Sequence, residues 1–385
     1  MRNVCVVITA RPSYSRIRSA LVALREYQNI NLQIVVAASA TTSKYGQVVE
    51  QIKTDGFTVT AEVYNLVSGE NTIAEAKTTG LGIIELANTF NNIKPDMVIT
   101  IADRYETMST AIAAAYMNIP LIHVQGGEVT GNIDEKVRHA ITKLADVHLV
   151  STEKAKERVI KMGELPESVY VTGCPSIDIA SRVFRNYEKI KFDPVDKYNG
   201  VGKLLPNREK YIVVMQHPVT TEIMRAKQQT QCLLDTVEGM NVQVYWFWPN
   251  VDAGADEVSK VIRINRECGK AQNIYFFKNM SPDDFLTLLM GSICIIGNSS
   301  VAIRECSYLG VPAINIGDRQ KGRERGRNVY DVAYEKEQII NAYNRIISLP
   351  RPEQDLLYGD GEAGKKIAKI VASLEHINIA KMLNY

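Results

Sequence analysis

Short continuous runs of Val, Ile and Leu alternate along this chain with longer amphipathic stretches, and this alternation constrains its fold most strongly. Strands that are buried on both faces are continuously apolar, as the strands of parallel sheets are. We predict strands at 4–9, 32–37, 96–101, 121–124, 147–150 and 169–172. Helices are predicted near 15–27, 72–93, 105–118, 135–145 and 153–162. Repeated βαβ units of this kind predict an α/β fold built on a doubly wound sheet.

The alternation lapses over residues 184–209, which are rich in charge, Gly and Pro, and we interpret them as a linker. A second series then begins, with predicted strands at 211–216, 242–248, 273–277, 293–296 and 313–316. Its helices are predicted near 221–238, 256–268, 282–290, 301–309 and 337–347. We therefore expect two Rossmann-like domains, at 1–183 and 210–363, followed by a C-terminal helix at 364–385. Two such domains place a ligand in the cleft between them, at the carboxyl ends of their strands.

Composition narrows the classes of function. The 385 residues carry a formal net charge of +2, with 45 % hydrophobic and 23 % charged residues, which is typical of a globular protein. A dedicated nucleic-acid binder is usually strongly basic. No run approaches the roughly 20 apolar residues of a membrane span, and the apolar run at 4–8 is shorter than the ~7–15 residues of a signal peptide's apolar region. We expect a cytoplasmic protein with neither a nucleic-acid nor a membrane partner.

The six cysteines show no Cys-x-x-Cys spacing, and most lie in apolar runs such as 292–296. This pattern predicts small buried side chains in a reducing compartment rather than metal ligands. We therefore expect no zinc or iron–sulfur site. The turn after the first strand has no G-x-G-x-x-G and no Walker motif, so we do not expect a dinucleotide cofactor or a P-loop nucleotide there.

The first two candidate sites follow strands of the first half. Arg11 and Ser15 begin the helix after the first strand, where unpaired N–H groups favour an anion such as phosphate. The alternative is a helix cap with a solvated Arg. Asp103 and Arg104 follow the strand at 96–101, at the carboxyl edge where α/β sites are built. Alternatively, Asp103 caps the next helix and Arg104 pairs with Glu106.

A third candidate is the Gly-rich segment 123–139. Its three glycines keep a loop open to a ligand, and four ionisable groups fall close together there: Glu128, Asp134, Glu135 and His139. Carboxylates with separated pKa values can divide acid and base work. The alternative is that Asp134 merely caps a helix.

In the second half, His217 ends a strand and is followed by Pro218, which suits an acid or a phosphate donor. Asn250 follows the next strand and can hydrogen-bond a ligand. A satisfied structural His and a turn-forming Asn are the alternatives.

The segment Gly297-Asn298-Ser299-Ser300 joins a strand to a helix that carries Glu305. Hydroxyl groups at this place suit a phosphate, and also plain N-capping. The segment 317–327 holds five basic residues, Arg319 among them, and suggests a local phosphate clamp because the overall charge is balanced.

Together these residues resemble the hydrolysing UDP-N-acetylglucosamine 2-epimerases of sialic-acid biosynthesis, including the epimerase half of the bifunctional animal enzyme. The matching stretches span nearly the whole chain in order. They are Asp103-Arg104, Gly126-Gly127-Glu128-Val129, Ile133-Asp134-Glu135, Arg138-His139-Ala140-Ile141-Thr142-Lys143, Gly173-Cys174-Pro175-Ser176, Gln216-His217-Pro218-Val219-Thr220-Thr221, Pro249-Asn250-Val251-Asp252-Ala253-Gly254, Gly297-Asn298-Ser299-Ser300, Arg304-Glu305 and Tyr358-Gly359-Asp360-Gly361.

The resemblance implies a GT-B-like fold whose C-terminal domain binds the nucleotide and whose last helix packs back across the domains. It implies a nucleotide-sugar substrate, no metal and no nicotinamide, and assembly as a homodimer or homotetramer. It assigns catalysis to Asp103, Glu128, Asp134 and His217. It assigns substrate binding to Arg11, Ser15, Arg104, Asn250, Ser299, Ser300, Glu305 and Arg319, with His217 also on the diphosphate.

The implied reaction is the conversion of UDP-GlcNAc and water to ManNAc and UDP through a 2-acetamidoglucal. The sequence departs from its relatives at Gln125, where they carry Glu or His, and at 38–40, where they carry Gly-x-His. The sequence therefore leaves two alternatives for the substrate. The sugar is GlcNAc or a diacetamido analogue, as in legionaminic acid synthesis, and the nucleotide is UDP or GDP. Asp256 and Asn279 replace positions of the animal enzyme's allosteric site, so we expect no feedback by CMP-sialic acid. A GT-B glycosyltransferase, a non-hydrolysing epimerase and a nucleotide-sugar sensor are the alternative functions.

Overall fold

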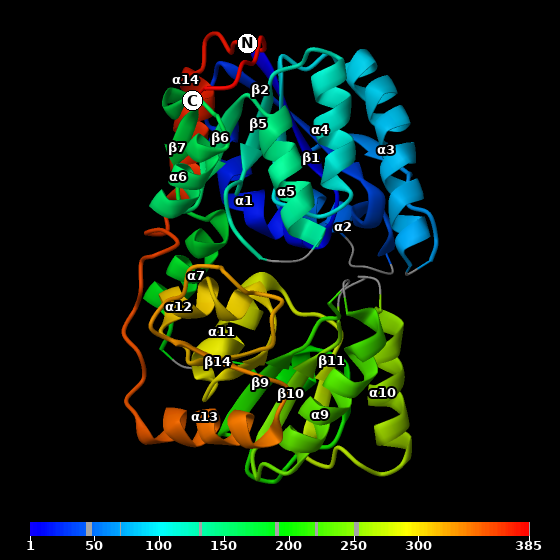
Figure 1. The fold of residues 1–385 in the computed structure, drawn as a ribbon, viewed down its shortest axis with the longest axis vertical. Helices are drawn as coiled ribbons and strands as arrows, with labels where there is room; N and C mark the ends of the chain where they lie inside the picture. The colour runs from blue at the N-terminus through cyan, green and yellow to red at the C-terminus, as the bar shows by residue number, and fades with distance from the viewer. Residues whose placement is uncertain are drawn as a thin grey trace. The chain divides into compact units, whose positions relative to one another are not determined.

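The computed structural model describes residues 1–43, 48–69, 71–130, 133–188, 192–219, 222–249 and 254–384. The chain divides into two compact units, each with its own sheet, which is parallel throughout in the first unit and mainly parallel in the second (Figure 1). The first comprises Met1–Glu128, Ile133–Asp178 and Tyr358–Tyr385, and the second Val129–Asn132 and Ile179–Leu357.

The first unit's described strands form a sheet in the order β3-β2-β1-β4-β5-β6-β7, with every pairing parallel. Its strands are β1 (Arg2–Ile8), β2 (Ile30–Ala37), β3 (Val59–Val63), β4 (Met97–Ile101), β5 (Leu121–Val124), β6 (Val147–Val150) and β7 (Val169–Val171). Its helices are α1 (Arg11–Arg25), α2 (Val48–Thr54), α3 (Thr72–Ile93), α4 (Thr107–Tyr116), α5 (Ile133–Leu144), α6 (Glu153–Lys161) and α14 (Ala363–Ser373), with 3-10 turns η1 (Ala38–Thr41) and η3 (Pro166–Ser168).

Strand β1 shows why continuous apolar runs predict this architecture. Val4, Val6 and Ile8 lie in a core that α1 and α14 complete, while Cys5 and Val7 lie in a second core on the other face, with α3, α4 and α5. Both faces of the sheet are thus covered by helices, and alternate side chains of one strand enter different cores.

The second unit repeats this plan. Its described strands lie in the order β14-β13-β12-β9-β10-β11-β8, parallel except for β8. They are β8 (Gly200–Gly202), β9 (Tyr211–Met215), β10 (Gln243–Phe247), β11 (Ile274–Phe277), β12 (Ile295–Gly297), β13 (Ala313–Ile316) and β14 (Val329–Val332). The helices are α7 (Pro175–Asn186), which begins in the first unit, α8 (Pro194–Lys197), α9 (Ala226–Glu238), α10 (Ala255–Glu267), α11 (Pro282–Gly291), α12 (Glu305–Leu309) and α13 (Lys336–Ser348), with 3-10 turns η4 (Ile223–Arg225) and η5 (Ser300–Ala302).

The predicted α/β class with two Rossmann-like domains is confirmed. The segment predicted as a linker carries α8 and β8, and β8 escaped prediction because it has no apolar run. Edge strand β3 was also missed, because its exposed and buried positions alternate. The helix predicted over 364–385 ends at Ser373, where Leu374 leaves the helical conformation. The domain limits proposed from the sequence remain predictions.

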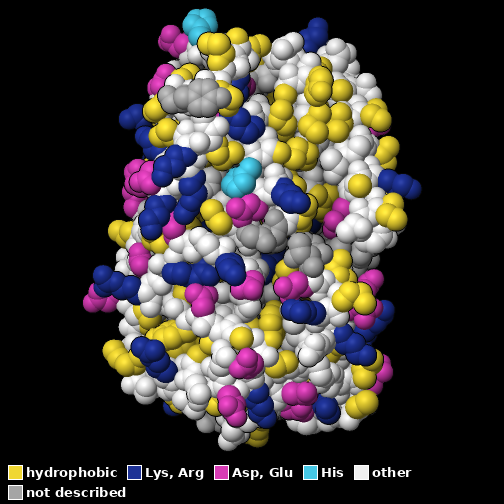
Figure 2. All heavy atoms as spheres, in the orientation of Figure 1, with side chains coloured by type: hydrophobic (Ala, Val, Ile, Leu, Met, Phe, Trp, Pro, Cys, Tyr) yellow, Lys and Arg dark blue, Asp and Glu magenta, His cyan; other side chains and the backbone are white. Residues whose placement is uncertain are grey.

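Acidic and basic side chains are interspersed over the face drawn in Figure 2, in keeping with the small net charge. Among the described residues, no helix combines the length and apolar character needed to cross a membrane.

Candidate functional site

The first unit's sheet changes direction between its neighbours β1 and β4, because the chain continues from β1 to β2 on one side and from β4 to β5 on the other. Loops that leave such a pair of strands diverge and open a crevice at their carboxyl ends. The predicted residues Arg11 and Ser15 follow β1, and Asp103 and Arg104 follow β4. The topology of the sheet therefore brings two of the predicted candidate sites to the carboxyl ends of neighbouring strands.

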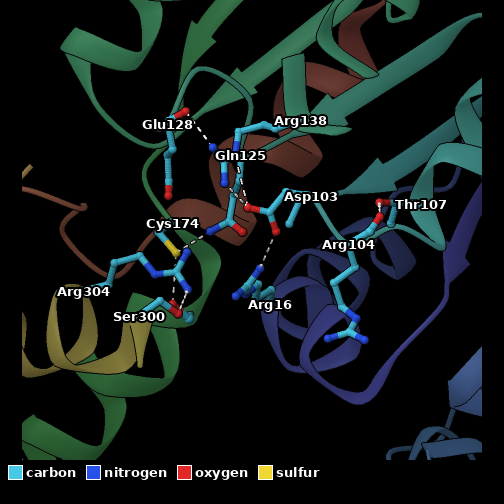
Figure 3. A network of polar contacts seen from close by, with 12 residues as sticks. Arg16, Asp103, Arg104, Thr107, Gln125, Glu128, Arg138, Cys174, Ser300 and Arg304 are labelled. Carbon is cyan, nitrogen blue, oxygen red and sulfur yellow. Dashed lines mark hydrogen bonds and ion pairs between the residues drawn. The ribbon is translucent and has the colours of Figure 1, made fainter. Parts of the chain in front are cut away.

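Asp103 is held by a buried guanidinium (Figure 3). Arg138 of α5 is completely buried and donates from Nε to Asp103 Oδ2 at 3.1 Å, and from Nη2 to the same oxygen. Arg16 lies 3.8 Å from the other carboxylate oxygen. Burial alone would lower the pKa of Arg138, but Asp103 and then Glu128 raise it overall, so the guanidinium stays charged. The capping alternative for Asp103 is not what the structure shows, since the residue preceding α4 is Glu106.

The turn that carries Asp103 is strained. Ala102 has a φ of +63°, a left-handed conformation that costs an Ala about 1 kcal/mol or more. His123 of β5 holds this turn by donating from Nε2 to the Ala102 carbonyl at 2.9 Å, while its Nδ1 lies 3.1 Å from the Thr142 hydroxyl. Complete burial lowers the pKa of His123 to about 3, so the ring is neutral. A neutral ring fits one donating and one accepting nitrogen.

Glu128 lies in the Gly-rich segment, directly after Gly127, and is almost fully buried. Its carbonyl accepts a 2.8 Å hydrogen bond from Arg138 Nη1, which fixes the loop to α5. Gly127 permits this path, because it has a φ of +74° and a Cβ there would lie 2.3 Å from the Ala155 carbonyl oxygen. Asp134, in the first turn of α5, also raises the pKa of Arg138. The carboxylates Asp103, Glu128 and Asp134 therefore share the field of one buried cation.

Arg104 behaves as its alternative interpretation proposed. It donates to buried Glu106 at 3.1 Å from Nε and 3.3 Å from Nη2, and Ser39 also donates to Glu106 at 3.2 Å. Ser39 lies in the 38–40 segment where the sequence departs from its relatives.

Arg11 begins α1, and burial lowers the pKa of its guanidinium. Within the described residues it makes no hydrogen bond or ion pair, which leaves it ready for an anion. Ser15 is turned back to the Arg11 carbonyl at 3.4 Å, a long contact. By contrast, Tyr14 bonds to Asp55, which Arg18 also holds at 2.8 Å, so this part of the segment is structural.

Gln125 extends the polar network toward Cys174 (Figure 3). It is buried at a φ of +70° and donates from Nε2 to Cys174 Sγ at 2.6 Å, and Cys174 in turn lies 3.0 Å from Ser176 Oγ.

In the second unit the direction changes between β9 and β12, which are neighbours in the sheet. His217 follows β9, and its backbone is fixed by Asn298: the His217 N–H donates to the Asn298 side-chain oxygen, and the Asn298 amide donates to the His217 carbonyl, both at 2.8 Å. Gly297 allows this close pairing with a φ of +141°, because a Cβ there would lie 2.0 Å from the Met215 carbonyl oxygen.

The hydroxyl residues occupy the start of the short turn η5. Ser299 accepts from the Val301 N–H at 3.4 Å, and Ser300 accepts from Arg304 Nη2 at 2.8 Å. Glu305 is buried, with Oε2 3.9 Å from Arg304 Nε. These contacts make Ser299 a capping residue, as its alternative proposed.

Arg319 lies in the basic loop and donates from Nη1 to the Asn298 carbonyl at 3.1 Å, and Gln320 donates to the same oxygen at 2.9 Å. Asn298 thus organises His217, Ser299 and Arg319 around one backbone turn. Asn250 lies outside the described residues. The second unit therefore gathers His217, Ser299, Ser300, Glu305 and Arg319, while their joint action with the first unit on one ligand stays a prediction.

Sequence reasoning missed the importance of three residues: His123, Arg138 and Asn298. Arg138 stands between apolar positions of the buried stripe of α5, at Val137 and Ile141. A charge at such a position implies a buried partner, so this signal was present in the sequence.

Comparisons with known proteins extend over most of the chain. The model of the family described as UDP-N-acetylglucosamine 2-epimerase matches residues 22–372. A Legionella pneumophila protein named UDP-N,N'-diacetylbacillosamine 2-epimerase (hydrolyzing) is 30 % identical, over 97 % of this chain and 96 % of its own. The Escherichia coli polysialic acid biosynthesis protein P7 is 34 % identical, over 89 % of this chain and 86 % of its own.

Solved structures share the fold. The Methanocaldococcus jannaschii UDP-GlcNAc 2-epimerase in complex with UDP-GlcNAc and UDP has a TM-score of 0.77 at 18 % identity, over 96 % of this chain and 99 % of its own. The Neisseria meningitidis UDP-GlcNAc 2-epimerase bound to UDP-GlcNAc has a TM-score of 0.76 at 17 % identity, over the same shares. The predicted GT-B-like fold is confirmed.

Proposed function

Because the chain belongs to the UDP-N-acetylglucosamine 2-epimerase family, we propose that it is a hydrolysing 2-epimerase, which converts a UDP-linked N-acetylglucosamine and water to the N-acetylmannosamine and UDP. The observation that carries the proposal is the grouping of Asp103, Glu128 and Asp134 about the buried Arg138 guanidinium. Inverting a carbon centre needs groups that remove and deliver a proton, and several carboxylates in one charged environment can divide these roles.

The chemistry begins with the leaving group. The hydrogen on C2 is weakly acidic, so the bond from C1 to the diphosphate oxygen must break as the proton leaves. Cationic and hydroxyl donors stabilise the departing diphosphate. We assign this task to Arg11, Ser15, Arg104, His217, Asn250, Ser299, Ser300 and Arg319, and contact with the ribose to Glu305.

A carboxylate then holds the proton taken from C2, and a 2-acetamidoglucal with a C1–C2 double bond remains. Water adds its oxygen at C1, and a second acid delivers a proton to the opposite face of C2. The proton removed from C2 and the proton delivered to C2 cancel. One hydrogen of the water stays on the new C1 hydroxyl and its other proton passes to the departed UDP phosphate, so the atoms balance. Asp103, Glu128, Asp134 and His217 are the proposed catalytic residues. Asp103 accepts two hydrogen bonds from the buried Arg138 guanidinium, and we therefore assign the proton transfer at C2 to Glu128 first.

The names of the relatives support the sugar class. Two relatives named as hydrolysing, from Legionella pneumophila and Campylobacter jejuni, are named for diacetylbacillosamine, the second with GDP or UDP. The Escherichia coli relative is named for polysialic acid biosynthesis. We therefore propose UDP-GlcNAc or a diacetamido analogue on UDP or GDP as substrate, and supply of a sugar for nonulosonic acid synthesis. We also propose a homodimer or homotetramer.

The reaction is tested with the full chain in deuterated water, with each nucleotide sugar offered without an acceptor. The proposal requires free UDP (or GDP) and deuterium at C2 of the released sugar, seen by mass spectrometry. A glycosyltransferase gives neither in quantity, and a non-hydrolysing epimerase returns the sugar still attached to its nucleotide.

A further inference from the structure

The C-terminal segment 374–384 has no regular secondary structure among its described residues, yet one of its side chains is fully satisfied inside the first unit. Lys381 Nζ donates to the Thr142 carbonyl at 3.2 Å, to Glu164 Oε2 at 2.6 Å and to the Ala145 carbonyl. These acceptors account for all three ammonium protons. Two of them belong to the C-terminal end of α5, where carbonyls lack partners within the helix and a cation is favoured.

The surroundings fix this contact further. Glu164 is buried and also accepts from Lys143 at 2.5 Å and from His148 at 3.0 Å, which together with Lys381 holds the pKa of Glu164 down to about 2 although burial opposes this. The Asn384 N–H donates to the Gly163 carbonyl at 3.1 Å. The segment is therefore anchored on both sides of Met382.

From Thr142 the contacts continue to the catalytic candidates. Thr142 and Arg138 are one helical turn apart on the same buried face of α5. Arg138 binds Asp103, while the Thr142 hydroxyl meets His123, whose other nitrogen holds the strained Ala102 carbonyl. Lys381 donates to the carbonyl of Thr142, so both the side chain and the backbone of Thr142 are fixed by hydrogen bonds.

We propose that Lys381 is a positioning residue, and that the C-terminal segment acts as a brace that holds α5, and through Thr142 and His123 the Asp103 turn, in the arrangement used for catalysis. The proposal rests on the proposed function. It assigns the brace an effect on the chemical step alone, because its contacts lie in the first unit and the nucleotide is assigned chiefly to the second.

The test compares steady-state kinetics of the full chain carrying Lys381→Met, Lys381→Gln or Thr142→Val. We expect kcat to fall about tenfold in each, because small misplacement of reacting groups is costly, while KM and the UDP dissociation constant change less than about twofold. Thr142→Ser restores the hydroxyl and is expected to restore kcat. Lys369→Met is the matched control, since Lys369 is exposed on α14 with no polar partner within the described chain.

The double variant Lys381→Gln/Thr142→Val separates a brace from two independent defects. A shared pathway predicts a combined loss near tenfold, whereas independent effects multiply to about a hundredfold. Wild-type kcat in folded Lys381→Gln, or multiplied losses, overturns the brace. If Lys381→Met does not fold, the kcat values of Lys381→Gln, Thr142→Val and Thr142→Ser test the proposal in its place. Absence of turnover in the unaltered protein would instead reject the proposed function.

Discussion

The two units place their candidate residues at equivalent points of their sheets but hold them by different means. In the first unit, ion pairs hold the candidate residues: Arg138 binds Asp103, and Arg104 binds Glu106. In the second, the neutral amide of Asn298 fixes the backbone of His217. Removing one partner of a buried ion pair costs much free energy. Hydrogen bonds from a neutral amide side chain instead fix the orientation of a backbone loop and of its N–H groups. We therefore propose that proton chemistry belongs chiefly to the first unit and anion binding chiefly to the second.

The largest effect is expected for Glu128→Gln, which removes a titrating group and keeps its shape. We expect kcat to fall by about a thousandfold, within the range for loss of an acid–base group. UDP affinity, measured by titration calorimetry, should stay nearly unchanged. Activity near that of the unaltered protein would remove Glu128 from the mechanism and weaken the division between the units.

Arg138→Met tests whether buried pairing carries the first unit. Removing the guanidinium leaves Asp103 without its buried partner, and we expect a loss of about 3 kcal/mol in the free energy of unfolding in urea. Arg182→Met is the matched control, because Arg182 and Asp283 form an ion pair whose side chains are 52 % and 40 % exposed. The control should lose at most about 1 kcal/mol. Equal losses would contradict the role assigned to burial.

His123 gives the first unit a pH dependence of stability. Its native pKa of about 3 lies below the ordinary value of 6.5, so below pH 6.5 the unfolded chain takes up a proton that the native ring refuses. Its contribution to stability is therefore complete above pH 6.5 and decreases as the pH falls toward 3. At pH 5 the decrease amounts to about 2 kcal/mol.

To test this, the free energy of unfolding is measured at pH 7 and at pH 5, both for the unaltered protein and for His123→Gln. The variant should lose about 2 kcal/mol less over this interval. The same loss in both would show that His123 titrates normally. Glu164 affects stability at lower pH. Its native pKa of about 2 lies below the ordinary value of 4.5, so its stabilising contribution is complete above about pH 4.5 and is lost as the pH falls toward 2.

How far the sequence predicts this molecule depends on the range of the interactions. Continuous apolar runs predict β1 and β9 because both faces of each strand are covered, and strand ends then locate Asp103 and His217. Edge strand β8 has no such pattern. Nor does any local pattern pair Lys381 with Thr142, because that contact joins segments far apart in the chain. The interpretation of Arg104 was open for another reason: its partner Glu106 is local, whereas the proposed ligand is not part of the chain.

The smallest effect is expected in the second unit, for His217→Ala and Arg319→Ala. Each removes one donor from a diphosphate that several groups share, so we expect UDP affinity to fall about tenfold, equivalent to ~1.4 kcal/mol. The fold should be unaffected in Arg319→Ala, because Gln320 still donates to the Asn298 carbonyl. Calorimetric titration with UDP measures the loss, and Lys321→Ala is the control, since Lys321 lies in the same loop but is exposed, 4.0 Å from Asp318. Unchanged affinity in both variants would move the diphosphate away from the turn that Asn298 organises, and with it the anion-binding role given to the second unit.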